Sequence, residues 1–199
     1  MKFVNFGVYT LSSAEGHMNT FRKSVRALLG LLLFCLPAFA QDQRVTSFSK
    51  NGLAFDYPAA TKIQDLSNQG GQQLVLVPSV GGAQIMVISH YEKITTAEQL
   101  AKARHDVVES FVDTLWQELQ KMDSKTTRTP AQIEINGIQA PGVRLRAVLN
   151  EEQGNAEVYS LLLGRRLVVL TLIGSDKEIA AAATAWATIR GSVKMEEQQ

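Results

Sequence analysis

The sequence predicts an α/β sandwich, in which helices pack on a mostly antiparallel sheet of six to eight strands. Short segments of alternating apolar residues are separated by glycine-containing turns, and such turns join antiparallel neighbours. One stretch of about 25 residues instead repeats its apolar residues every three or four positions, which indicates an amphipathic helix. An alanine-rich segment near the C-terminus repeats in the same way. We therefore expect one long helix and one C-terminal helix.

The composition is that of a globular protein. The chain has 199 residues, of which 45% are hydrophobic and 20% are charged, and its formal net charge is +1. The apolar content argues against a disordered chain. The near-neutral charge argues against a nucleic-acid-binding protein, which needs a basic surface. The single cysteine excludes an internal disulfide framework.

The first 40 residues have the pattern of a leader. Residues 22–26 contain three basic side chains and precede an uncharged apolar run over residues 27–40. This run is shorter than the about 20 apolar residues that cross a bilayer. Ala38 and Ala40 form a small-x-small cleavage site before Gln41. We expect a signal peptide that is removed after Ala40, and an N-terminal membrane anchor is the alternative.

Met18 is the expected start of this signal peptide. A signal peptide of residues 18–40 has an ordinary length and carries its basic cluster near its start. Residues 1–17 contain no targeting feature, so we interpret them as a mis-assigned start. Cys35 follows bulky apolar residues rather than the small residues of a bacterial lipid-attachment motif, so we interpret it as a hydrophobic residue of the leader.

Removal of the leader leaves residues 41–199 as one expected domain. Residues 1–40 hold four of the 20 basic and one of the 19 acidic residues, so the remaining part has a net charge of −2 and no cysteine. A domain of this length buries roughly 68–70% of its unfolded surface, which is enough for a core without disulfides or metals. We expect a periplasmic or secreted protein without a stable membrane span.

Four strands are expected before the long helix, at residues 45–49, 53–58, 73–78 and 84–91. Asn51-Gly52 and Gly81-Gly82 predict tight turns between them. The polar segment 61–71 is interpreted as a loop.

The long helix is expected to begin at a capping box formed by Thr95 and Glu98. Its apolar stripe comprises Leu100, Val107, Val108, Phe111, Val112, Leu115, Trp116 and Leu119. A stripe of this width must cover a large apolar surface, and a sheet face is the expected partner. We therefore expect Trp116 in the core.

Four further strands are expected at residues 131–136, 143–149, 156–163 and 167–173. Ser175 and Glu178 form a second capping box, which predicts the start of the C-terminal helix. Trp186 belongs to the core stripe of that helix, and Gly191 is expected to end it. Residues 192–195 are expected to add a short final strand.

Several of these features together resemble the PsbP/Mog-like family. They are the opening strand Asn51–Pro58, the turn Ile135–Ala140, the long hairpin, the strand Leu167–Ile173, and the helix with Trp186 that leads into residues 189–192. The resemblance covers residues 45–195 and includes small exported bacterial proteins. It implies an antiparallel sheet between helical layers. Members include a thylakoid-lumen subunit of the oxygen-evolving complex and a nuclear-transport factor that binds a small GTPase, so it implies binding or assembly rather than catalysis. No functional residue of that family can be matched here.

The chain lacks the common catalytic patterns. Residues 41–199 contain no cysteine, no G-x-S-x-G motif and only two histidines, His90 and His105. His105 and Glu109 are four residues apart and could point from one helix face at a metal ion, with Asp106 and His90 completing the site, but zinc needs three or four converging ligands. We expect these residues to be solvent-exposed, and we expect no catalytic residues, no metal site and no cofactor.

Four arginines are candidates for an anion or partner patch: Arg144, Arg146, Arg165 and Arg166. In a hairpin the first two share one face, and Glu157 on the returning strand lies opposite them. A solvated sheet face is the alternative interpretation.

The function expected from the sequence is that of an exported, non-enzymatic binding or assembly protein. Its partner would be a protein or a small ligand in the cell envelope, not a nucleic acid. The alternative is a small secreted hydrolase or metal-dependent enzyme, which would require a converging polar cluster in a pocket.

Overall fold

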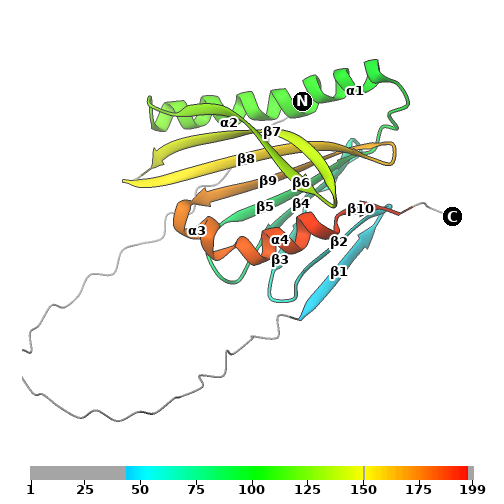
Figure 1. Ribbon diagram of the computed structural model, residues 1–199, viewed down its shortest axis with the longest axis horizontal. Coiled ribbons are helices and arrows are strands. Elements are labelled where there is room, and N and C mark those ends of the chain that lie inside the picture. The colour runs from blue at the N-terminus through cyan, green and yellow to red at the C-terminus, as the bar shows by residue number, and fades with distance from the viewer. Residues whose placement is uncertain (1–43, 150, 197–199) are drawn as a thin grey trace, which may run out of the picture. The chain divides into compact units, whose positions relative to one another are not determined.

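A seven-stranded antiparallel sheet lies at the centre of the computed structural model, which describes residues 44–149 and 151–196 (Figure 1). In spatial order its strands are β3 (Lys62–Asp65), β4 (Gly71–Val77), β5 (Gln84–His90), β9 (Arg166–Ser175), β8 (Glu152–Leu163), β7 (Ile138–Leu149) and β6 (Thr127–Ile135). A second, three-stranded sheet contains β1 (Val45–Lys50), β2 (Leu53–Pro58) and β10 (Lys194–Met195).

Helices cover both faces of the large sheet (Figure 1). One face carries a continuous helix made of α1 (Ala97–Ala103), the π-helical segment η1 (Arg104–Glu109) and α2 (Ser110–Met122). The other face carries α3 (Asp176–Ala181), α4 (Ala183–Ser192) and the small sheet. The predicted α/β sandwich, with its antiparallel sheet, long helix and C-terminal helix, is confirmed.

Alternating side chains of the large sheet belong to two separate hydrophobic cores, one on each face. On β9, Val168 and Leu170 pack with β2 and α4, whereas Leu167 and Val169 pack against the long helix. Successive strand residues point to opposite faces, so one continuous apolar strand can serve both layers. This explains why residues 167–173 carry almost no polar side chain.

Two Asn-Gly turns form the tight hairpins that the sequence predicts. Asn51 and Gly52 have φ angles of 51° and 82°, and Asn136 and Gly137 have 46° and 77°. Positive φ at both central positions is the geometry of a type I′ turn, whose twist matches that of the flanking strands.

The start of the long helix differs from the prediction. The capping box is formed by Thr96 and Gln99, one residue later than the predicted pair Thr95 and Glu98. The Gln99 side chain accepts hydrogen bonds from the backbone N–H groups of Thr95 and Thr96. A glutamine can close a capping box as well as a glutamate. Both Thr95 with Glu98 and Thr96 with Gln99 therefore fit the sequence pattern, and the pattern alone does not decide between them.

Other boundaries also differ. The segment expected as a loop at 61–71 contains β3. The C-terminal helix begins at the predicted Ser175–Glu178 capping box, but it breaks at Ala182 and continues past Gly191 to Ser192. The expected strands 45–49 and 192–195 both pair with the expected strand 53–58, and the three form a separate sheet. The sequence does not predict this separation, because alternating apolar residues indicate a strand but not its neighbour.

Two expectations about the leader fall outside the described residues. They are the signal peptide and its cleavage residues Ala38, Ala40 and Gln41. Within the part of the chain that the structure describes, no helix has the length and apolar character needed to cross a membrane.

Gly142 allows β7 and β8 to pair closely opposite Tyr159. A Cβ atom at residue 142 would lie 2.3 Å from the carbonyl oxygen of Val158 and 2.4 Å from Cδ1 of Tyr159. We expect Gly142→Ala to lower the free energy of unfolding by about 1–3 kcal/mol, because the backbone must shift. Urea denaturation measures this change.

Gly154→Ala on the neighbouring strand is the matched control. Its Cβ would meet no atom closer than 3.6 Å, so its stability should remain within about 0.5 kcal/mol of the wild type. Equal destabilisation by both substitutions would contradict the steric explanation.

Candidate binding surface

Arg144 and Glu157 form the ion pair expected from the hairpin. They are partners in the β7–β8 register, and Nε of Arg144 lies 2.7 Å from Oε1 of Glu157. The Tyr159 hydroxyl donates a hydrogen bond of 2.8 Å to the other oxygen of Glu157. Burial, followed by this bond to a carboxylate, raises the pKa of Tyr159 to about 12. The three side chains hold β7 and β8 in register.

Arg146 extends this polar row toward α3. Its Nη2 atom lies 3.3 Å from Oδ2 of Asp176, and the amide group of Asn155 donates to the other oxygen of Asp176. Asp176 is the first residue of α3, so the row connects the hairpin to the N-terminus of that helix.

Arg165 and Arg166 lie at the turn between β8 and β9, at the opposite end of β8 from Asn155, the register partner of Arg146. Arg166 donates a 2.7 Å hydrogen bond to the carbonyl of Asn51, and its guanidinium lies 5.5 Å from the centre of the Tyr91 ring. The carbonyl of Arg165 accepts a hydrogen bond from the Ile94 N–H. Glu157 lies six residues before Leu163, the last residue of β8, which corresponds to about 20 Å along the strand. The structure therefore separates the four arginines into two groups, each of which makes structural contacts.

A hollow of about 280 Å³ lies where the C-terminal end of α2 passes over the sheet. Its sheet side is lined by Ala147, Gly154, Ala156 and Ile173. Ala147 is the register partner of Gly154, and Ala156 is the partner of Ile173. Because small residues adjoin each other across two strands, this part of the sheet does not fill the space beneath the helix.

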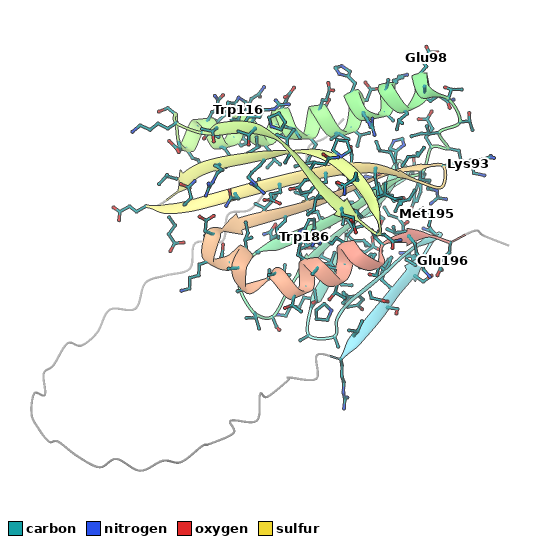
Figure 2. All side chains as sticks on the ribbon, in the orientation of Figure 1. Lys93, Glu98, Trp116, Trp186, Met195 and Glu196 are labelled. Carbon is teal, nitrogen blue, oxygen red and sulfur yellow. The ribbon has the colours of Figure 1, made fainter. Side chains whose placement is uncertain are left out.

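The helix side of the hollow is apolar and incompletely covered. Leu115 and Leu119 line the hollow, and both are only partly buried. Within α2 only Val112 is fully buried. Trp116 is partly buried and packs against the core beneath the long helix, and Trp186 is 7% exposed, so both tryptophans contact a core as predicted. Figure 2 shows these two tryptophans on α2 and α4, on opposite sides of the sheet.

The rim of the hollow is rich in hydrogen-bond acceptors. Glu152, Asn155, Ser175 and Glu178 line it. One oxygen of Glu178 accepts the Ser175 N–H at 2.8 Å, which closes the capping box of α3. The side chain of Asn155 lies on the opposite face of β8, beside its register partner Arg146, where its amide group donates to Asp176. None of the residues that line the hollow is lysine, arginine or histidine.

A second, smaller recess of about 180 Å³ shares Ala147 with the hollow. Asp123 lines it, but both carboxylate oxygens accept backbone N–H groups, one from Val148 and one from Lys125. These bonds hold the pKa of Asp123 below its ordinary value. They also connect the end of α2 to β7, which makes Asp123 a structural residue.

The weak metal candidates do not converge. His105 and Glu109 form an exposed pair with 2.7 Å between Nδ1 and Oε2, and the glutamate raises the pKa of His105. His90 is on β5, apart from the helix surface that carries this pair. Within residues 44–149 and 151–196 no group of three or more His, Cys, Asp or Glu side chains is placed to hold a metal ion.

The sequence analysis missed the hollow. Its signal is the set of small residues Ala147, Gly154 and Ala156, which interrupts two otherwise bulky strands. Those residues become neighbours only through the β7–β8 register, and the sequence does not state this register.

The raised pKa of Tyr159 makes stability depend on pH. Below about pH 10 the tyrosine is protonated in both the folded and the unfolded chain. Between the ordinary value of 10.0 and about 12 only the unfolded chain ionises, so the free energy of unfolding falls as pH rises. The loss attributable to this residue is at most about 2–3 kcal/mol.

We expect Tyr159→Phe to flatten this pH dependence, because phenylalanine does not ionise. Urea denaturation between pH 8 and about 11.5 compares the two slopes, and Tyr57→Phe is the control. Parallel slopes for the wild type and Tyr159→Phe would contradict the assignment.

No protein-family model matches the chain, and no curated protein matches it. Solved structures give matches at low identity. A protein of Bacteroides thetaiotaomicron is 10% identical with a TM-score of 0.49; the match covers 76% of this chain, and the chain spans about half of that protein, 48%. LpqN of Mycobacterium tuberculosis, described as involved in cell envelope biogenesis, is 12% identical with a TM-score of 0.45, covering 77% of this chain and 91% of LpqN. The solution structure of cyanobacterial PsbP from Synechocystis is 16% identical with a TM-score of 0.48, covering 77% of this chain and 93% of PsbP. A PsbP is thus among the solved structures that match this chain at low identity.

Proposed function

We propose that this protein is an exported, non-catalytic binding domain that holds an apolar group of its partner in the hollow beneath α2. The observation that carries this proposal is the hollow itself. Leu115 and Leu119 face a sheet surface built from Ala147, Gly154 and Ala156, and this space is accessible to solvent. Apolar surface that a fold leaves open in a concave site favours the binding of an apolar group.

The size of the hollow indicates what it holds. Sites for drug-sized ligands occupy about 300–1,000 Å³. The hollow, at about 280 Å³, lies just below this range. It therefore suits a single side chain or a group of similar size, and a side chain is what a partner protein would present.

Two of the three carboxylates that line the recesses have structural roles. Asp123 is held by two backbone N–H groups, and Glu178 caps α3. A general acid or base must be free to exchange a proton with a substrate. Only Glu152 is left for such a role, and it has no histidine or second free carboxylate beside it among the residues that line the hollow.

Export is supported by the sequence pattern before the domain. The basic cluster at 22–26, the apolar run at 27–40 and the small residues at 38 and 40 are the parts of a signal peptide. The expected exported chain lacks cysteine, so it cannot be cross-linked by a disulfide in an oxidising compartment.

Filling the hollow tests the binding role. The probe is the blocked tripeptide acetyl-Gly-norleucine-Gly-amide, whose four-carbon side chain would contribute about 0.8 kcal/mol per buried carbon. We expect saturable NMR shifts at residues 152–156 with a dissociation constant of millimolar order. Gly154→Leu should abolish them, because residue 154 lies on the helix-facing side of β8 between two lining positions.

Gly191→Leu is the matched control, since a Cβ at residue 191 has no atom within 4 Å. It should leave the titration unchanged. The proposal fails if the wild type shows no saturable shifts, or if Gly154→Leu binds the peptide equally well while remaining folded.

N-terminal sequencing of the exported protein tests the leader. We expect the first residue to be Gln41, because signal peptidase requires small residues at positions 38 and 40. Ala40→Phe should retain the leader, whereas Phe39→Leu should be cleaved normally. The start is tested on the uncleaved precursor, which Ala40→Phe retains, and recovery of precursor peptides from residues 1–17 would contradict a start at Met18.

A further inference from the structure

We propose that the hollow receives the basic side chain, lysine or arginine, of a partner protein, with its aliphatic stem on the apolar floor and its charge at the acidic rim. This inference rests on the proposed binding function and names the chemistry of the occupant. It follows from the composition of the rim, which is distinct from the apolar floor.

The rim offers acceptors and lacks basic side chains. Glu152 and Glu178 contribute carboxylates. No lysine, arginine or histidine lines the hollow. A ligand that donates hydrogen bonds and carries positive charge complements both carboxylates.

Glu152 is the carboxylate best placed to meet this charge. It makes no ion pair with the described residues, whereas Glu178 already accepts the Ser175 N–H. Nearby Arg146 pairs with Asp176 and so does not neutralise Glu152. The only charged side chains that line the hollow are therefore the two carboxylates, and Glu152 is the one that forms no ion pair with the described residues.

The strand geometry matches a long basic side chain. Glu152, Gly154 and Ala156 alternate along β8, so their side-chain positions lie on the face beneath α2. Two residues along a strand span about 7 Å, roughly the reach of an extended lysine side chain from Cα to Nζ. A stem lying over Gly154 can thus reach Glu152 with its charged end. Lysine and arginine commonly bury their stems while the charged group stays at the surface.

The test compares two peptides that differ only in the charge. Acetyl-Gly-Lys-Gly-amide and acetyl-Gly-norleucine-Gly-amide have the same aliphatic stem, and only the lysine carries an ammonium group. In NMR titrations at low salt we expect the wild type to bind the lysine peptide about fivefold more tightly, the upper value for a partly exposed ion pair. Added salt should reduce the difference.

Glu152→Gln should remove the preference for lysine and leave norleucine binding unchanged. Glu151→Gln is the matched control, because it removes the same charge from the adjacent residue, which does not line the hollow. It should preserve most of the preference. Urea denaturation of both variants verifies that they remain folded.

The outcomes separate this inference from the proposed function. Equal binding of the two peptides to the wild type, with both lost in Gly154→Leu, would overturn the inference and keep the hollow as a binding site. A lysine preference that survives in Glu152→Gln would also overturn it. Binding of neither peptide to the wild type would remove the proposed function as well.

Discussion

The register of β8 between β7 and β9 is the constraint on which the rest of the structure depends. A shift by one residue would exchange the two faces of the strand and place Tyr159 and Leu161 on the side of the long helix. Three local features oppose such a shift. Gly142 leaves room for the Tyr159 ring, Arg144 pairs with Glu157, and Gly164, with a φ of 58°, makes the tight turn into β9. Both cores and the hollow follow from this register.

The two faces of the large sheet differ in the size of the side chains that cover them. The face toward α4 is closed by large side chains, and Trp186 and Tyr159 have ring centres 6.4 Å apart. The face toward the long helix is closed by Val112 at its middle, but toward the end of α2 the sheet presents alanine and glycine. Both layers have a buried core, but only the layer beneath the long helix leaves an open apolar space at the end of α2. The site is held in shape by Asp123, which connects the end of α2 to β7.

Much of the fold could be predicted from the sequence, because local signals mark its elements. The Asn51-Gly52 turn, the stripe of the long helix and the Ser175–Glu178 capping box each depend on residues close in the chain. Features that depend on pairing could not be predicted. The separation of the two sheets depends on β10 choosing β2, and the hollow depends on Ala147 meeting Gly154. In the sequence, residue type alone groups the four arginines. In the fold, Arg144 and Arg146 lie on β7, whereas Arg165 and Arg166 lie at the turn between β8 and β9.

The pairing of β2 with β10 has a consequence for the order in which the chain can fold. β2 is among the first described strands, and its partner Lys194–Met195 is the last. Contacts between residues so far apart form late, because a long loop must close first. The edge of β2 therefore stays unpaired until the whole domain is available. Under the proposed export, with the N-terminus crossing the membrane first, this arrangement delays completion of the fold until the C-terminal residues have followed.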